Sequence, residues 1–411
     1  MLIMLILIIV SGNPAMTFGL PHQPFYVAVA VLFFVLILLK KIKIVSPFSV
    51  SIFLFFIFVL TYQSFSFSFY PYVTILGFIV RLFIAYAAVR LIKDFARTYV
   101  DVMYRLAILS IIFYVPQQLG NFMGFDFRAI FEPIGLLFGE SQYGSPMTIF
   151  IYTFGAGESY RNAGFFWEPG AFAGYLNLAL IFIAAVSWQY NNRAFWKRFI
   201  VLLVCLLSTF STSGYVAAPL ALLLHLQIKH RTVVSTALRI TMVTYIVAIG
   251  AFVYYAFVWE QPFMKSKVLH SITVVEQQSP GWEADRIGTI FFDLDYIKER
   301  PFTGWGLHAN TRLALSPYLT RLIETGRGNG MSDFAAKFGL VALFLWMFFV
   351  FKYLSILFNG NVIKSGLGLL CIMIVLNGEC YLNYPLFLCF FFLFKTVQQK
   401  KNDTDQQYKK G

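Results

Sequence analysis

The sequence contains little charge and little cysteine. Asp, Glu, Lys and Arg make up 12% of the 411 residues, against about 25% in a typical soluble domain. No CxxC spacing occurs, which argues against a zinc site and against a disulfide framework, and no His, Asp and Glu cluster shows metal-ligand spacing. We therefore expect neither a metal nor another cofactor. The cysteines lie in or beside apolar segments, at Cys205, Cys371, Cys380 and Cys389.

Long apolar segments take the place of charge. Hydrophobic residues make up 59% of the chain, with 48 Phe and a mean hydropathy of +0.72. A run of about 20 apolar residues matches the ~30 Å hydrocarbon core when the chain is helical. Membrane β-strands would alternate apolar and polar residues, whereas residues 27–39 are continuously apolar. The sequence predicts an all-α, polytopic integral membrane helical bundle.

Twelve transmembrane helices are predicted, in a single membrane domain over residues 1–411. Residues 1–10 lack the basic segment and the A-x-A-like site of a signal peptide, so we interpret them as part of a retained first span. Basic clusters, such as those around Lys40 and Arg90, fall in alternate short connections, which places both termini in the cytoplasm. Residues 397–411 form a polar cytoplasmic tail. The predicted spans cover residues 1–20, 25–39, 44–62, 71–90, 104–120, 169–189, 199–213, 214–228, 237–258, 332–353, 365–381 and 383–396.

Residues 199–228 allow two interpretations. They form either one long tilted span or a hairpin of two short spans. Basic clusters at both ends favour the hairpin, because the chain must then return to the cytoplasmic side. We expect the break at residues 211–214, which read Ser-Thr-Ser-Gly.

Two long segments lie outside the cytoplasm in this topology, at residues 121–168 and 260–331. The second carries five Arg and three Lys. This charge suits anionic lipid head groups or a phosphorylated substrate, or it is ordinary solvated loop charge. An amphipathic helix on the membrane face or on the spans is predicted within it, because apolar residues recur at helical spacing. They are Ile287, Ile290, Phe291, Leu294 and Ile297, followed by Pro301 as a stop and by a turn at residues 304–306.

The first long segment enters a span through a distinctive string, Arg161-Asn-Ala-Gly-Phe-Phe-Trp-Glu168-Pro169. Pro169 suits the first turn of a helix, where its missing N–H costs nothing. Glu168 then lies at the helix N-terminus, where the macrodipole stabilises its charge. One interpretation is a helix cap with an interfacial aromatic residue. The other is a polar cavity at the outer membrane face, lined by Arg161 and Glu168.

The pattern Gly-x-Phe-x-Glu-Pro-x-x-Phe at residues 164–172, preceded by Arg161, resembles the O-antigen polymerase (Wzy-type) family. Residues 211–215 and 300–306 resemble a Ser/Thr-Gly element and a Pro-x-x-Gly-x-Gly stretch of the wider polymerase and ligase group. Residues 334–343, which contain Phe338-Gly339-Leu340, resemble the span that closes the large external loop. The resemblance covers residues from about 150 to 345.

The resemblance implies a glycosyltransferase of the bacterial inner membrane. Such enzymes join oligosaccharide units carried on undecaprenyl pyrophosphate at the periplasmic face. A sugar hydroxyl on one unit attacks the anomeric carbon of another, and undecaprenyl pyrophosphate leaves. The resemblance also implies a GT-C-like fold. The implied partners are the lipid-linked glycan, membrane lipids and a chain-length regulator protein, with no nucleic acid.

This chemistry needs cations for the departing pyrophosphate and a base for the hydroxyl proton. Arg161 is the candidate catalytic cation. Glu168 and His308 compete for the role of base, because a His titrates near neutral pH. The candidate substrate-binding cations in the second long segment are Arg286, Arg300 and Arg327.

Three further residues are candidate substrate contacts. Trp167 and Trp305 either stack on sugar faces or anchor the chain at the membrane interface. Arg81 lies near the middle of a predicted span, where a charged residue usually faces a cavity or a partner. It either reaches the lipid pyrophosphate or pairs with Glu379 from another span.

Two other functions remain open. An O-antigen ligase shares this layout but transfers glycan to lipid A-core. Ligases carry a His just before the closing span, whereas residues 327–333 contain none. A lipid-linked oligosaccharide flippase is not an enzyme. It is expected to place more charge inside the spans and does not need two long basic external segments.

Overall fold

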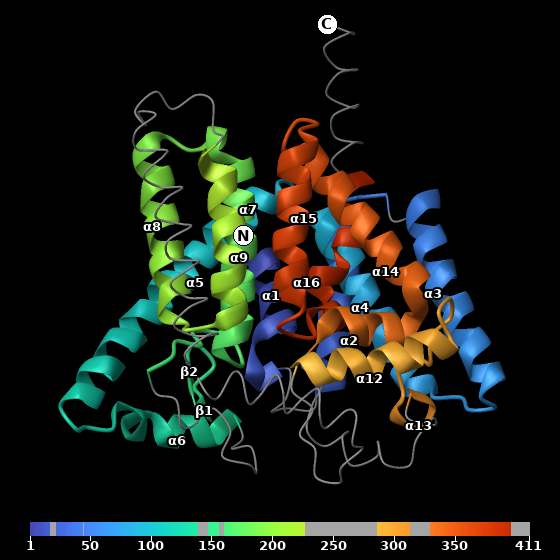
Figure 1. Ribbon diagram of the computed structural model, residues 1–411, viewed down its shortest axis with the longest axis horizontal. Coiled ribbons are helices and arrows are strands. Elements are labelled where there is room, and N and C mark those ends of the chain that lie inside the picture. Colours follow the sequence, from blue (N-terminus) through green and yellow to red (C-terminus); the bar gives the residue numbers. More distant parts are fainter. Residues whose placement is uncertain are drawn as a thin grey trace, which may run out of the picture.

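A computed structural model describes residues 1–16, 22–43, 45–138, 147–155, 160–226, 286–312 and 329–395. These ranges fold mainly as a bundle of helices (Figure 1). The N-terminal part contains α1 (Leu2–Gly12), α2 (His22–Leu39), α3 (Pro47–Ser66), α4 (Tyr72–Leu91) and α5 (Phe95–Phe122). The rest of the bundle contains α7 (Pro169–Ala185), α8 (Asn192–Ser208), α9 (Thr212–Leu226), α14 (Gly330–Leu357), α15 (Val362–Leu376) and a C-terminal apolar helix, Pro385–Lys395, that begins with α16 (Pro385–Leu388).

Four of the described helices are long and apolar enough to cross a membrane, namely α3, α4, α5 and α14. Their outward side chains are apolar: Phe58 is 68% exposed, Leu76 is 62% exposed and Phe344 is 59% exposed. Large apolar side chains on the outside of several helices are unfavourable in water and favourable in hydrocarbon. The chain is therefore a multi-pass membrane protein.

The described helices overlap the predicted spans in sequence, but four of them, and not twelve, are long and apolar enough to cross a membrane. Span 237–258 lies outside the described residues. The span predicted at 1–20 is too long, since α1 ends at Gly12 and its 11 residues extend only ~16 Å. The helix stops because Asn13 adopts extended backbone, and its Nδ2 donates to the carbonyl oxygens of Phe150 (2.6 Å) and Phe165 (3.3 Å).

The described part of residues 199–228, which covers 199–226, folds as the helical hairpin that the basic clusters favoured. Helix α8 ends at Ser208 and α9 begins at Thr212. Ser211 in the break is buried, and its Oγ accepts a hydrogen bond from the Gly214 N–H (3.3 Å). The break therefore lies within two or three residues of its predicted place.

The connections that carry the basic clusters gather at one end of the bundle. The Arg90 guanidinium at the end of α4 donates to the Lys43 carbonyl between α2 and α3 (3.1 Å). At the α7–α8 connection, which includes η4 (Ser187–Gln189), Gln189 Nε2 donates to Asp94 before α5 (2.9 Å). The Arg198 guanidinium contacts the Asp101 carboxylate at 2.8 Å. These contacts bring segments far apart in the sequence to the same end.

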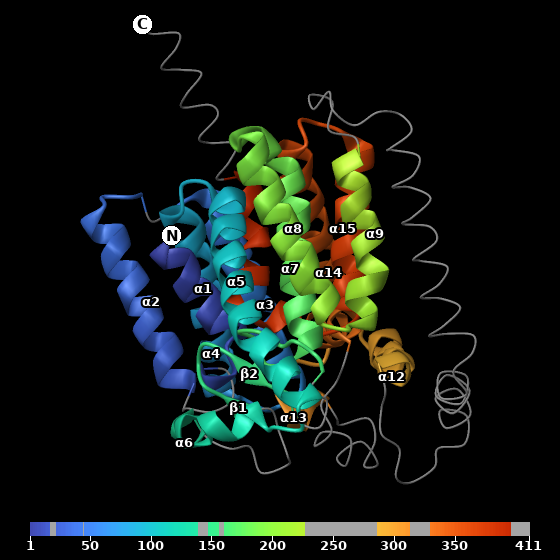
Figure 2. The ribbon, with the colours of Figure 1, turned by 90° about the vertical axis from the view of Figure 1, so that its left-hand side faces the viewer.

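The described parts of the two long segments lie at the opposite end of the bundle, with α6 and α12 on different sides (Figures 1 and 2). The first contains η2 (Phe127–Phe131), α6 (Glu132–Gly135), η3 (Leu136–Phe138) and an antiparallel hairpin of β1 (Met147–Thr148) and β2 (Thr153–Phe154), with Met147 opposite Phe154. The sequence did not predict this hairpin. A small apolar cluster under it contains Met147, Ile149, Tyr152 and Phe154. The second long segment contains α12 (Arg286–Glu299) and α13 (Ala309–Arg312).

Helix α12 forms where the apolar spacing predicted a helix and ends at Glu299, before Pro301. The buried face differs from the predicted apolar stripe. Asp293 is fully buried against α14, whereas Leu294 is 39% exposed. Asp293 tolerates burial because its Oδ2 accepts a hydrogen bond from Ser332 Oγ (2.7 Å). The polar contact thus sets how the helix is rotated on the bundle.

Helix α7 lies at the centre of the bundle, with residues 170–185 all buried. It packs against α5, α8, α9 and α15. Small residues near its start allow neighbouring segments to approach closely. Gly174 contacts the Tyr381 side chain, and Ala173 contacts Gly214 of α9. The start of α7, with the Glu-Pro string, is therefore held by rigid neighbours.

Candidate functional site

The loop before α7 is fixed by the buried side chain of Asn162. Its Nδ2 donates to Ser208 Oγ (2.9 Å) and to Ser110 Oγ (3.2 Å), on α8 and α5. Its Oδ1 accepts from the Gly164 N–H (2.9 Å). Gly164 has φ +56°, which favours glycine. The sequence therefore encodes a rigid turn that delivers the following residues to the helix start.

Arg161 and Glu168 flank this turn. Arg161 is partly buried, and its Nε donates to the Thr209 carbonyl in the α8–α9 connection (3.2 Å). Glu168 is the N-cap residue of α7 and Pro169 is the first helical residue, as predicted. The Glu168 side chain makes no capping hydrogen bond to the helix. Trp167 packs its ring against those of Tyr384 (5.2 Å between centroids) and Tyr381 (6.1 Å), so it contacts protein.

A break in α14 joins the second long segment to the bundle. Gly339, within the helix, has φ +83° and ψ 164°, which is not helical. The Ala336 carbonyl accepts from the Trp305 N–H (2.8 Å), and the Lys337 carbonyl accepts from the Gly306 N–H (3.0 Å). A hydrogen-bonded carbonyl avoids a cost of several kcal/mol at membrane depth. Residues 301–306 therefore supply bonds that the helix itself has lost.

The docking of residues 301–306 is reinforced on both sides of the break. The Leu340 N–H donates to the Pro301 carbonyl (2.7 Å). The buried Gln63 side chain of α3 donates to the carbonyls of Thr303 and Lys337, the latter at 2.8 Å. Gly304 has φ +65° and lies against the backbone of residues 337–339, where no side chain fits. The two stretches singled out in the sequence, 300–306 and 338–340, thus pack directly on each other.

The buried Lys337 and the partly buried Arg81 meet at Asn383, which ends η8 (Tyr381–Asn383). Lys337 Nζ contacts the Asp333 carboxylate at 2.6 Å and Asn383 Oδ1 at 3.2 Å. The Asn383 carbonyl accepts from Arg81 Nη1 (3.1 Å). The Lys337 and Asp333 side chains are only 10% and 3% exposed. We call Arg81, Asp333, Lys337 and Asn383 the polar cluster.

For Arg81, the sequence left open a pyrophosphate contact or a pair with Glu379. In the structure its guanidinium donates to the carbonyls of Asn383 and of Gly77 (3.2 Å). It also lies 5.7 Å from the centre of the Tyr26 ring. These partners of Arg81 are backbone carbonyls and an aromatic ring, and such groups do not neutralise its positive charge.

Arg300 and Trp305 stack at the outer end of α3. The Arg300 guanidinium lies 4.2 Å from the centre of the Phe67 ring and 4.9 Å from that of Trp305, and Nη1 donates to Ser66 Oγ (2.8 Å). The Trp305 ring is 6% exposed, and its Nε1 donates to the Tyr296 carbonyl (2.8 Å). Trp305 therefore holds the 300–306 stretch on α3 and α12, and little of its face is open to a sugar.

His308 is partly buried. Its ring lies 4.9 Å from that of Phe69, and Nδ1 accepts from the Asn310 N–H (3.2 Å). Arg286 is the first residue of α12. Arg327 lies outside the described residues. Among the described residues no group of three or more His, Cys, Asp and Glu side chains is placed to hold a metal ion.

A path of contacts connects Trp167 with the 300–306 stretch. Trp167 contacts Tyr384, which follows Asn383; Asn383 contacts Lys337; and the Lys337 carbonyl binds Gly306. The start of α7 and the 300–306 stretch are therefore parts of one assembly at one end of the bundle. This assembly contains Arg81, Lys337 and Arg300 as cationic side chains.

The buried pair and its neighbours were not predicted from the sequence. Asp333 and Lys337 stand four residues apart in a predicted span, and opposite charges at this spacing meet on one helix face. Charged residues inside a span usually have a functional or partner role, so this signal was present. No comparable pattern marks Gln63, which donates to the distant Lys337 carbonyl, or Asn383, which accepts from Arg81 and Lys337.

Comparisons of the chain with models of protein families, with curated proteins and with solved structures find no match.

Proposed function

We propose that the chain is a polymerase of O-antigen or a related surface polysaccharide, and that it acts at the periplasmic face of the bacterial inner membrane with twelve spans. One observation supports this most strongly. One assembly at the end of a membrane bundle contains the Glu-Pro helix start, the 300–306 stretch and the break at Gly339. Its cationic side chains are Arg81, Lys337 and Arg300. A donor with a lipid tail and a diphosphate needs positive charge at a membrane edge.

In the proposed reaction a sugar hydroxyl oxygen on one lipid-linked unit bonds to the anomeric carbon of another. The bond from that carbon to the diphosphate oxygen breaks, and undecaprenyl pyrophosphate leaves with the electron pair. The hydroxyl proton passes to Glu168 or His308. Arg161, Arg286, Arg300 and Arg327 stabilise the leaving diphosphate, and each charge-assisted hydrogen bond contributes about 1.5–3 kcal/mol.

The test is the lipopolysaccharide gel pattern of a deletion strain that carries variants of the chain. Arg161→Ala and Arg286→Ala are expected to abolish long chains and to leave the single-unit cap at normal protein levels. Arg193→Ala is the matched control, because this exposed Arg lies in the first turn of α8, at the opposite end. It should keep the full ladder.

Each other pattern has a definite meaning. An unchanged ladder in a variant removes that Arg from the site. Loss of the single-unit cap in the deletion strain identifies a ligase, and accumulation of lipid-linked units at the inner leaflet identifies a flippase. Reporter fusions that place residues 260–331 in the cytoplasm would overturn the proposal, because the donor could not reach them.

A further inference from the structure

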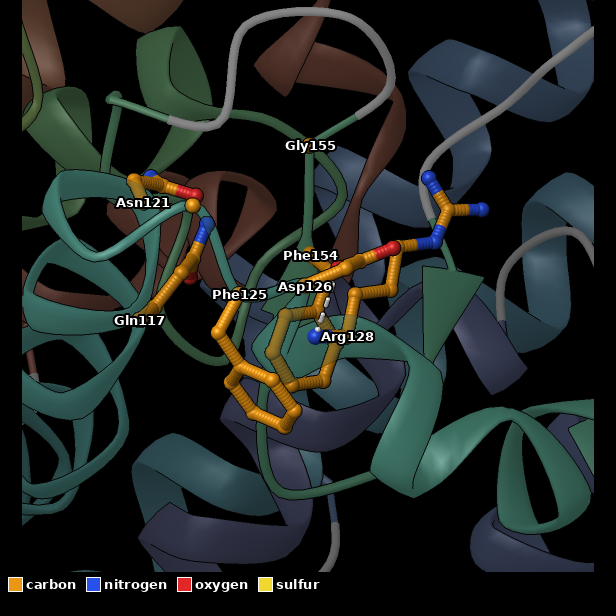
Figure 3. A pocket seen from close by; sticks show the side chains of 8 residues that line it. Gln117, Asn121, Phe125, Asp126, Arg128, Phe154 and Gly155 are labelled. Atoms are coloured by element: carbon orange, nitrogen blue, oxygen red, sulfur yellow. Dashed lines mark hydrogen bonds between the residues drawn. The ribbon is translucent and has the colours of Figure 1, made fainter.

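A pocket of about 470 Å³ opens beside the C-terminal end of α5. Ligand pockets commonly have volumes of ~300–1,000 Å³. No residue of the polar cluster or of the sequence-predicted site lines it. Its walls come from α5, from the turn that follows, and from the end of β2 (Figure 3). The lining residues are Gln117, Asn121, Gly124, Phe125, Asp126, Arg128, Phe154 and Gly155.

The turn after α5 places Phe125 and Asp126 at the pocket. Gly124 has φ +72°, and its N–H donates to the Asn121 carbonyl (3.3 Å), while the Phe125 N–H donates to Gly120 (2.8 Å). These two bonds form a Schellman motif, which reverses the chain with a left-handed glycine. Asp126 then caps η2 by accepting from the Arg128 N–H (2.9 Å). The backbone conformation is thus fixed on both sides of the Phe125 ring.

The wall opposite the turn is also rigid. Gln117 is buried, and its Oε1 accepts from the Tyr152 hydroxyl (2.8 Å). Burial raises the pKa of Tyr152 above its usual range, so the hydroxyl stays protonated and keeps donating. Asn121 lies one helical turn further along α5 on the same face. Its carboxamide and that of Gln117 lie next to each other in Figure 3.

The lining chemistry discriminates among ligand classes. Carboxamides and a carboxylate offer several donors and acceptors, and the half-exposed Phe125 ring offers an apolar face. A phosphate would meet the Asp126 carboxylate, while the Arg128 guanidinium lies on the far side of the pocket from Gln117 and Asn121 in Figure 3. An acyl chain would desolvate the polar groups without compensation. A sugar ring carries both hydroxyls and an apolar face and fits this set.

We propose that this pocket binds a neutral sugar residue of the glycan and retains the chain while units are added at the polar cluster. The role in retention rests on the proposed function; the binding of a sugar does not. Phe125 covers one face of the ring, and the carboxamides of Gln117 and Asn121 bond its hydroxyls.

The binding test uses the full chain purified in detergent and saturation-transfer NMR. The probes are free D-glucose, D-galactose, N-acetyl-D-glucosamine and L-rhamnose. At least one should receive saturation from the protein. Asn121→Ala and Phe125→Ala should weaken its binding roughly threefold to tenfold, since each removes one contact. Phe122→Ala is the matched control, because this neighbouring ring is 89% exposed and does not line the pocket.

A sugar signal that is absent for all four probes, or that the two pocket variants leave unchanged, overturns the proposal. Phe125→Leu keeps an apolar group of similar size but no ring, and it should show the same loss if Phe125→Ala folds poorly. In cells, Asn121→Ala should shorten the ladder without abolishing it. If Arg161→Ala loses the ladder but no sugar binds the purified chain, only the pocket proposal fails. If a sugar binds but Arg161→Ala keeps its ladder, Arg161 is removed from the proposed site and the pocket proposal stands.

Discussion

The pair of Asp333 and Lys337 gives the sharpest prediction of stability. Lys337→Met keeps the length of the side chain and removes its charge, which leaves the Asp333 carboxylate buried. The two side chains are 3% and 10% exposed, and their charged atoms are 2.6 Å apart. Breaking a buried pair by removing one partner costs about 3–5 kcal/mol, because the remaining charge has been taken out of water. We expect the free energy of unfolding to fall by about that amount.

The double variant Asp333→Asn with Lys337→Met separates charge from packing. Replacing both members of a buried pair is often close to neutral. Lys337 also donates to Asn383 Oδ1 (3.2 Å), so the double variant should retain a deficit of about 1 kcal/mol from that lost bond.

The assay is SDS-induced unfolding of the purified chain in mixed micelles, followed by tryptophan fluorescence. Lys298→Met is the matched control. Lys298 pairs with Asp295 at 3.1 Å, but both side chains are 74% exposed. An exposed pair contributes at most about 1 kcal/mol. Equal midpoints for Lys337→Met and Lys298→Met, or a double variant as unstable as the sum of its singles, would refute the reasoning.

Two further predictions concern backbone geometry. Gly339→Ala should lower the unfolding midpoint and, under the proposed function, impair polymerisation, because a residue other than glycine is strained by at least about 1–2 kcal/mol at φ +83°. The control is Gly366→Ala in α15, where an added methyl group meets no neighbouring atom. It should leave the midpoint the same or higher. Asn162→Ala should destabilise the chain by about 1–3 kcal/mol per buried partner left unsatisfied, measured in the same unfolding assay, whereas Asn162→Asp should retain the bond to the Gly164 N–H. A midpoint unchanged in Asn162→Ala would mean that the turn before α7 is held by other contacts.

The sequence predicted the membrane class, the α8–α9 hairpin and the Pro169 helix start, because each depends on local rules. The length of an apolar run, the alternation of basic connections and the geometry of proline can each be recognised from residues that are close together in the sequence. It overestimated the first helix because Asn13 bonds to carbonyls about 140 and 150 residues away. No local pattern reveals such a partner.

The site was predictable in part for the same reason. Gly304 and Gly339 stood out within motifs, but their shared role, a helix break completed by another segment, depends on tertiary contact. The rotation of α12 was mispredicted because periodicity treats Asp293 as a solvent-facing residue. Ser332, which makes its burial favourable, lies on another helix.

The docking of residues 301–306 limits how a substrate can enter. Lifting this stretch away would leave the carbonyls of Ala336 and Lys337 and the Gln63 side chain without their partners in it, at a cost of about 1–3 kcal/mol for each buried group left unsatisfied. The stretch is therefore a fixed wall and not a gate. If the proposed function holds, a long lipid-linked donor would have to approach between helices or past the other long segment.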